Sequence, residues 1–410
     1  MGAAALNFRA SFFAAPHRVM FLGGAVQALL AMAFWSLQIG SHYAGLWSLP
    51  VWPLLTQIPM TTWHALVMGS GVFPWFVFGF ILTAGPRWQG AGDLGQKQFL
   101  PPFLLLAGGW VLAWLALLLP VLLVFGLALA AIGWALVARI LTRIALLPAL
   151  SREHIRYVAL AAWLGVIGLA CYLLLALAGD PAWGRVGTML TLWGFLLPVF
   201  ATVAHRMLPF FTSAVIRGYV VHRPAWALRV LIAAGLGHGL LSLFDFARWL
   251  WLVDLAALVA SGHLSRIWWH RTIGGNRMVL VLHLAFAWVP IAFALFALQD
   301  LPGLLAPGAL GQAPLHALVI GFFSSMLIGM VSRVTLGHSG RPVAADGSMW
   351  ASFCMMQLAA ALRVIAELPM QGYGTTLLWL SAMTWLLGFG VWALAYAPVL
   401  WRARLDGKPG

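Results

Sequence analysis

The sequence predicts an all-α, polytopic membrane protein with about twelve transmembrane helices and both termini in the cytoplasm. Three observations support this fold class. Of the 410 residues, 63% are hydrophobic and only 8% are charged, and the mean hydropathy is +0.96, which excludes a soluble globular domain. Apolar runs of about 20 residues, each long enough to cross the bilayer as a helix, recur along the whole chain. The basic residues gather in every second loop between these runs.

Twelve apolar runs follow one another without an intervening soluble domain, so we treat residues 1–410 as a single membrane domain. The first run follows a short basic segment, and it is long enough to be a retained transmembrane helix rather than part of a cleaved signal peptide. Pro120 separates the third run from the fourth. The predicted spans lie at residues 17–40, 61–84, 100–119, 121–142, 156–178, 186–212, 224–244, 247–268, 277–299, 312–336, 347–368 and 375–400.

The distribution of charge predicts the topology. A net charge of +14 would also suit a nucleic-acid-binding protein, but the basic residues lie in alternate loops, which is the positive-inside pattern of membrane proteins. With an even number of spans, this pattern places both termini in the cytoplasm. The predicted partner is therefore the lipid bilayer and not nucleic acid. The basic positions are Arg9 and Arg18, Arg87 and Lys97, Arg139 to Arg156, Arg217 and Arg223, Arg266 to Arg277, Arg333 and Arg341, and Arg402 to Lys408.

Two predicted spans share a sequence pattern. The segment WHALVMG, which starts at residue 63, returns as LHALVIG, which starts at residue 315, an offset of 252 residues. Both segments begin spans that enter the membrane from the periplasmic side. The helices near 61–84 and 312–336 are therefore predicted to form a parallel internal repeat.

The repeat places His64 and His316 at the same depth on parallel helices, and this arrangement predicts a haem with two histidine ligands. Neutral imidazole nitrogens bind iron from both faces of such a haem. The alternative is that each histidine only caps a helix at the membrane interface, but the matched depth favours a shared haem. Cys171 and Cys354 form no CxxCH motif, so the haem is expected to be a non-covalent b-type haem. Small residues that would let a flat macrocycle lie against the backbone follow both histidines: Gly69, Ser70 and Gly71, and Gly321, Ser324 and Ser325.

The other histidines separate by depth. His205, His283 and His338 lie near the cytoplasmic ends of their spans and form a candidate copper site, although no HxxH or HxH spacing makes it specific. His238 lies deeper in the membrane, between glycines, and Asp254 is one of the few carboxylates within the bilayer, a scarcity that argues against an elaborate proton pump. The histidines expected to be solvated are His17, His42, His154, His222 and His270.

Arg363 is the basic residue deepest in the outer half of the predicted membrane region. An unpaired guanidinium at such a depth costs about 2.5–3.5 kcal/mol on insertion scales, so a partner is expected. Glu367 follows one helical turn later and would neutralise it as a structural pair. The propionates of a haem held by His64 and His316 are the functional alternative, which we favour because arginine binds carboxylates bidentately.

Several of these segments resemble the NnrS family, membrane proteins of the bacterial nitric oxide response that are described as containing haem and copper. The resemblance is carried by WHALVMGSGVFPWFVFGFILTAGPRWQG, RMLPFFT, LHLAFAW and HALVIGFFSSMLIGMVSRVTLGHSGRP, which together spread over most of the chain. It implies twelve spans and places functional weight on His64, His283, His316 and His338. Leu66 and Val67 stand where the family has a second histidine and a glutamate, so this sequence lacks that potential ligand.

A second resemblance is architectural. Haem-copper oxidases and nitric oxide reductases hold a haem between histidines of their second and tenth helices, with an arginine beyond the eleventh helix at the propionates, and Arg363 is placed similarly. The expected protein is thus an inner-membrane haem protein in nitric oxide metabolism or protection, with nitric oxide or a related small molecule as its partner. Whether it is an oxidoreductase stays open, since a haem with two histidine ligands favours electron transfer. The alternative is a transporter with a histidine-lined path.

Overall fold

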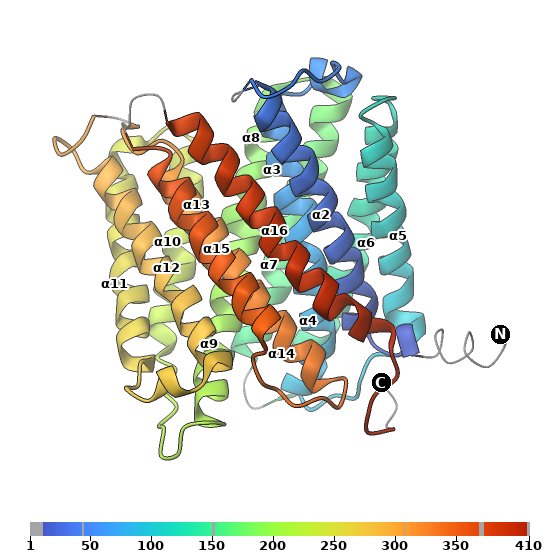
Figure 1. The fold of residues 1–410 in the computed structure, drawn as a ribbon, viewed down its shortest axis with the longest axis vertical. Coiled ribbons are helices and arrows are strands. Elements are labelled where there is room, and N and C mark those ends of the chain that lie inside the picture. Colours follow the sequence, from blue (N-terminus) through green and yellow to red (C-terminus); the bar gives the residue numbers. More distant parts are fainter. Residues whose placement is uncertain (1–10, 43–44, 150–151, 307, 369–372, 408–410) are drawn as a thin grey trace.

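The structure is a computed structural model that describes residues 11–42, 45–149, 152–306, 308–368 and 373–407. Within these residues the protein is a bundle of helices without β-strands, and twelve helical segments are long and apolar enough to cross a membrane (Figure 1). The predicted all-α class with about twelve spans is therefore confirmed, while the cytoplasmic position of the termini stays a prediction. Arg9 and Lys408, two of the basic residues used to predict the topology, lie outside the described residues.

The twelve segments begin and end within a few residues of the predicted spans. Three of them contain a π-helical segment, in which backbone hydrogen bonds connect residues five apart. Short 3₁₀ turns, η1 (Pro53–Thr56) and η5 (Ile273–Gly275), lie in loops. The segments are α2 (Pro16–His42); α3, η2 and α4 (Met60–Ala65, Leu66–Val72, Phe73–Trp88); α5 (Gln96–Leu115); α6 (Leu122–Leu146); α7 (Glu153–Ala178); α8, η3 and α9 (Pro181–Met189, Leu190–Leu196, Leu197–Ser213); α10 (Ala225–Leu243); η4 and α11 (Ala247–Trp249, Leu250–Trp268); α12 (Arg277–Asp300); α13, η6 and α14 (Ala313–His316, Ala317–Ser324, Ser325–Gly337); α15 (Gly347–Ile365); and α16 (Gly374–Trp401).

Local sequence explains where several helices begin and end. The side chains of Asp180, Asn276 and Asp346 each accept a hydrogen bond from a backbone N–H two or three residues later, which caps the first turns of α8, α12 and α15. Gly179 ends α7 at a φ of 71°, a left-handed conformation that glycine adopts without a steric penalty. The chain therefore turns from α7 into α8 within two residues.

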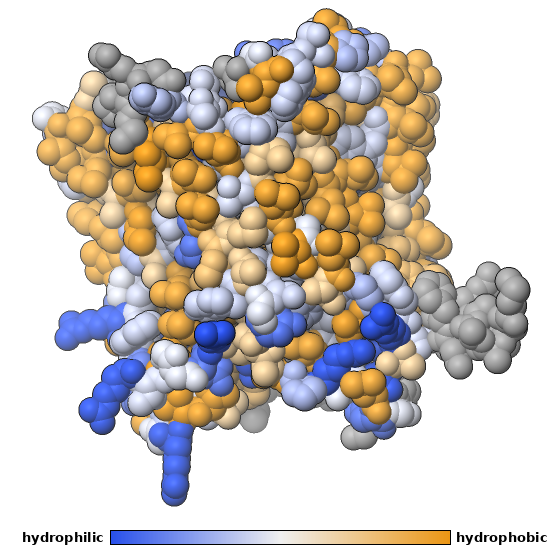
Figure 2. All heavy atoms as spheres, viewed as in Figure 1, coloured by the Kyte–Doolittle hydropathy of each residue, from blue (hydrophilic) through white to orange (hydrophobic). Residues whose placement is uncertain are grey.

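The first span begins, and the last span ends, at the same end of the bundle. The Arg18 guanidinium donates hydrogen bonds to the backbone carbonyls of Leu400 and Arg402, at 3.2 and 2.8 Å. We call this the terminal end of the bundle, and the opposite one the distal end. Figure 2 shows long hydrophilic side chains projecting at the terminal end, below a broad apolar band. That the terminal end faces the cytoplasm stays a prediction.

The second, sixth and tenth spans form the centre of the bundle. They are the spans that contain π segments among the described residues, and 83%, 72% and 78% of their apolar 18-residue windows is buried, against at most 56% in the other spans. The π segments also contact each other, since the hydroxyl oxygens of Ser70 in η2 and Thr191 in η3 lie 3.2 Å apart. Because π segments are frequent at functional sites, these three spans are where a site is expected.

The outer hairpin of α5 and α6 is held by close backbone contact. A Cβ atom added at Gly109 would lie 2.6 Å from the carbonyl oxygen of Gly126 and 2.7 Å from the nitrogen of Ala130. A Cβ added at Gly126 would lie 2.7 Å from the carbonyl oxygen of Gly109 and 2.8 Å from the nitrogen of Ala113. This reciprocal arrangement is the small-xxx-small packing of membrane helices, in which small residues let two backbones approach.

We therefore expect Gly109→Val to lower the free energy of unfolding by about 1–3 kcal/mol or more, because the added side chain meets backbone atoms that cannot yield. Gly108→Val is the matched control, since a Cβ at Gly108 has no heavy atom within 4 Å. Each variant replaces one glycine of α5 with the same β-branched side chain. Denaturation in detergent measures the difference, and equal stability of the two variants would contradict the packing.

Candidate functional site

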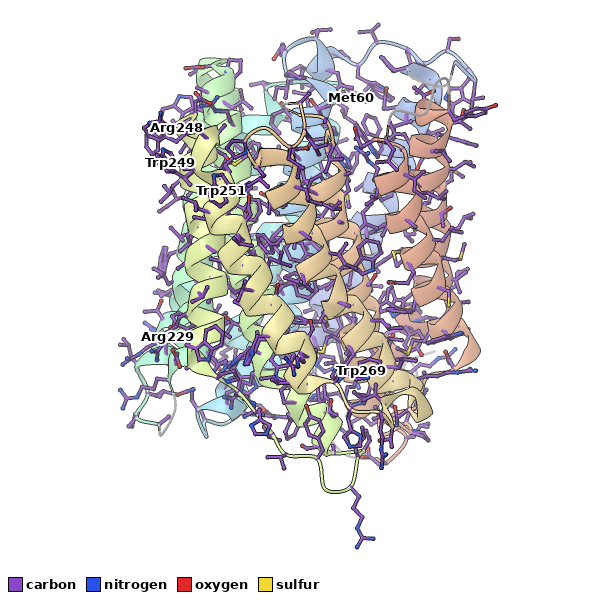
Figure 3. All side chains as sticks on the ribbon, turned by 90° about the vertical axis from the view of Figure 1, so that its left-hand side faces the viewer. Met60, Arg229, Arg248, Trp249, Trp251 and Trp269 are labelled. Atoms are coloured by element: carbon purple, nitrogen blue, oxygen red, sulfur yellow. The ribbon has the colours of Figure 1, made fainter. Side chains whose placement is uncertain are left out.

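His64 and His316 both lie at the beginning of a central span, next to a π segment. His64 belongs to α3 and precedes η2 by two residues, while His316 is the last residue of α13 and directly precedes η6. Figure 3 shows Met60, the first residue of α3, at the distal end of the bundle. The helix starts therefore place both histidines near that end.

The hydrogen bonding of His316 suits a metal ligand. Its Nδ1 lies 2.9 Å from the carbonyl oxygen of Gln312 and donates a proton to it in the neutral ring. This bond leaves the Nε2 lone pair of the imidazole free, and metal-binding histidines commonly hold their second nitrogen in this way. The His64 ring stacks on Trp35 of α2, with centroids 3.9 Å apart and planes 18° apart.

The structure brings three predicted site residues together. The imidazoles of His64 and His316 lie close enough to interact electrostatically, and the guanidinium of Arg363 acts on both. Arg363 also donates to Glu367, with 2.5 Å between Nη1 and Oε1, so the structure contains the ion pair that was the alternative to propionates. The bond to Glu367 uses Nη1, so the other donors of the Arg363 fork are available to a second carboxylate.

Buried polar groups without a hydrogen-bond partner lie on the two helices that carry His64 and Trp35. Gln38 follows Trp35 by one turn on the same face of α2, and it is 1% exposed with no hydrogen-bond partner for either side-chain atom. The indole N–H of Trp63, the residue before His64, is also buried without a partner. Buried polar groups are normally paired, so these groups are available to a polar partner from outside the chain. Two imidazoles, a guanidinium and free N–H donors fit the iron and the carboxylates of a haem.

The small residues near the histidines have another role. A Cβ at Gly71 would lie 2.9 Å from the Trp110 ring, and a Cβ at Gly321 would lie 2.4 Å from the Trp288 ring. These glycines therefore accommodate tryptophans of neighbouring helices, not the macrocycle that the sequence suggested. Only the tertiary structure reveals this, because the tryptophans come from distant positions in the chain.

The structure does not gather His205, His283 and His338 into one group. His205 Nδ1 lies 3.0 Å from His154 Nε2, and His283 Nε2 lies 2.9 Å from the Thr212 hydroxyl. The described residues contain no group of three or more histidine, cysteine, aspartate or glutamate side chains that would hold a metal ion. Each of the three predicted copper ligands therefore has its own surroundings.

Two histidines predicted to be solvated are buried. His17 is 2% exposed, and its ring centroid lies 4.7 Å from that of His338; His154 is 8% exposed and bonds His205. The sequence prediction failed because both residues stand beside arginines, yet Arg18 itself is buried at the terminal end. Burial, aided by nearby arginines, lowers the pKa of His338 to about 4, so its imidazole is neutral at neutral pH.

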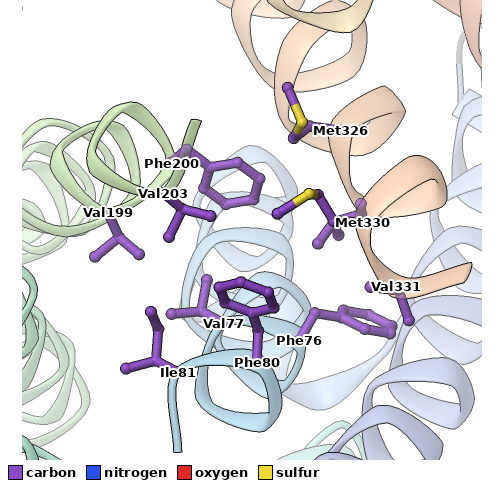
Figure 4. A pocket seen from close by; sticks show the side chains of 11 residues that line it. Phe76, Val77, Phe80, Ile81, Val199, Phe200, Val203, Met326, Met330 and Val331 are labelled. Carbon is purple, nitrogen blue, oxygen red and sulfur yellow. The ribbon is translucent and has the colours of Figure 1, made fainter. Parts of the chain in front are cut away.

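An apolar cavity of about 40 Å³ lies among the three central spans (Figure 4). Its lining includes Phe76 and Phe80 from α4, Phe200 from α9, and Met326 and Met330 from α14. All lining residues are apolar, and such cavities stay free of water and accept small apolar molecules. Sequence reasoning missed it, because its residues look like ordinary packing residues of a span.

The comparisons with known proteins give one family. The model of the family described as NnrS protein matches residues 11–404, which is nearly the whole chain. No curated protein matches the chain.

Proposed function

The chain belongs to the NnrS family, and we propose that it is a haem protein of the nitric oxide response in which His64 and His316 bind one b-type haem. Arg363 is proposed to bind the propionates. Nitric oxide or a related small molecule is the proposed partner, and the inner membrane of a bacterium is the proposed location. The observation that carries the proposal is the grouping of His64 and His316, at the distal ends of two central spans, with Arg363 of the neighbouring helix α15.

Each residue has a defined task in this proposal. The Gln312 carbonyl holds the proton of His316 at Nδ1, so that Nε2 is free to bind iron. Trp35 covers one face of the His64 ring and keeps water away from it. Arg363 supplies a positive charge for carboxylates. A haem with two histidine ligands is coordinatively full and supplies electron transfer.

Oxidoreductase chemistry on nitric oxide would require a further open metal centre. Copper is the proposed second metal, with His205, His283 and His338 as proposed ligands. Because each of the three has a different partner in the structure, one ion binding all three would require their helices to move. The apolar cavity between the central spans matches the size and polarity of an uncharged diatomic gas.

An optical spectrum with iron and copper analysis of the purified protein tests this proposal. We expect a Soret band and a sharp α-band after reduction, with one haem per chain. Haem supply during expression must be ample, so that low occupancy is not mistaken for absence of a site. A folded but colourless preparation would contradict the haem proposal and favour the transporter.

A further inference from the structure

A histidine and an aspartate form a buried pair between α10 and α11. His238 Nδ1 lies 2.7 Å from Asp254 Oδ1, and the two side chains are 7% and 0% exposed. The second carboxylate oxygen of Asp254, Oδ2, is buried and has no hydrogen-bond partner. A carboxylate in the membrane interior is costly, and ionisable residues in such positions commonly belong to proton relays.

The surroundings of the pair are aromatic. The Trp193 ring of η3 packs on the His238 ring with centroids 4.1 Å apart, and Phe296 of α12 meets it edge-on at 4.7 Å. A Cβ at Gly239 would lie 2.9 Å from the Trp193 side chain. Gly239 therefore lets the indole reach the imidazole, whereas a Cβ at Gly237 would meet Val253.

One further acidic group lies near the pair. Asp300, the last residue of α12, is partly exposed and interacts electrostatically with both Asp254 and His238. Figure 3 shows Arg248, Trp249 and Trp251, at the start of the eighth span, at the distal end of the bundle, and Asp254 follows Trp251 by less than one turn. The pair is thus close to the distal surface, with Asp300 beside it.

A purely structural role explains this arrangement poorly. Buried ion pairs are often no more stabilising than well-packed apolar residues. A structural pair would also be expected to satisfy both carboxylate oxygens, whereas Asp254 Oδ2 has no partner.

We propose that His238 and Asp254 form an intramembrane proton-binding site that exchanges protons with the distal end through Asp300. Uptake of one proton changes the charge of the pair from −1 to zero, and no other bond forms or breaks. The apolar surroundings favour the neutral state, since an isolated charge is poorly solvated there. The proposal does not depend on haem.

The site is physically connected to the centre of the bundle. Trp193 and Thr191 belong to the same π segment, and the Thr191 hydroxyl lies 3.2 Å from that of Ser70 in η2, which follows His64. Two contacts therefore connect the pair to the π segment that follows His64: the contact of His238 with Trp193, and that of Thr191 with Ser70.

Proton counting on the purified full-length protein tests the proposal. In weakly buffered detergent solution, a pH dye measures the protons taken up per chain between about pH 9 and pH 5, where ordinary aspartates stay ionised. We expect Asp254→Asn to take up one proton fewer than the wild type. Asp245→Asn is the control, because Asp245 is exposed and paired with Arg185, and its uptake should equal that of the wild type. Equal uptake by Asp254→Asn and wild type would overturn the proposal.

Two further variants keep the test decisive. If Asp254→Asn does not fold, the double variant His238→Leu with Asp254→Leu replaces the pair with apolar side chains, a replacement that buried ion pairs often tolerate. It should take up one proton fewer than the wild type, and unchanged uptake would count against the site. Asp300→Asn removes a carboxyl that itself takes up a proton in this pH range, so the count falls by that proton, and the proton bound by the pair should arrive severalfold more slowly after a rapid pH jump. An unchanged rate would refute Asp300 as the route.

Discussion

Replacing His316 with alanine is expected to abolish the low-spin haem signal and to lower the haem affinity by more than about 10–100-fold, because removal of only a hydrogen-bonding partner of a metal ligand already costs that much affinity. His316 presents a free Nε2 because its Nδ1 bonds the Gln312 carbonyl. His64→Ala should behave in the same way. Haem quantification and optical spectra of detergent-purified protein measure both effects.

A matched control separates ligation from damage to a span. His263 also lies partly buried within a span, α11, where its ring centroid is 5.0 Å from the Trp226 ring, and His263→Ala should keep full haem content. Addition of free imidazole to His316→Gly should restore the low-spin spectrum, because the small base replaces the missing ligand. Unchanged spectra in both alanine variants would rule out the axial-ligand assignment.

Arg363→Leu is expected to lower the reduction potential of the haem by about 70 mV. A positive charge stabilises the reduced, less positive iron; at about 10 Å and an effective dielectric constant of about 20 it contributes about 1.7 kcal/mol, which corresponds to about 70 mV for one electron. The leucine variant also leaves the carboxylate of Glu367 without its partner, and this acts in the same direction. A redox titration of protein with full haem content measures the shift.

Three further variants separate the effect of the Arg363 charge on the reduction potential from that of the Glu367 charge. Arg363→Lys keeps the charge and should keep most of the potential, whereas Glu367→Gln removes a negative charge and should raise it. The double variant Arg363→Leu with Glu367→Gln isolates the contribution of the arginine. A potential that stays constant or rises in Arg363→Leu would show that Arg363 serves only the ion pair with Glu367.

The sequence predicted the positions of the spans, because every span lies in the same hydrocarbon environment. Hydrocarbon requires about 20 apolar residues per span, so the positions of twelve spans follow from local composition alone. The prediction for 61–84 is an example, since the observed segment is Met60–Trp88. The repeated HALV segments likewise mark His64 and His316 through their shared pattern alone.

The sequence did not predict which polar side chains contact each other where two helices pack together. His17 was expected in solvent and is buried beside His338, and His205 bonds His154 instead of His283. Nothing in the pattern of a span shows which face meets another helix, because lipid and protein interior are equally apolar.

By itself, then, the sequence determined the membrane environment, the number and limits of the spans and the two histidines at matching positions. Tertiary structure alone decided the π segments and the pairing of His238 with Asp254. Span formation depends on hydropathy summed over neighbouring residues, which the sequence contains directly. Polar pairing depends on which helices lie side by side, and the low-dielectric interior then makes each such contact energetically important.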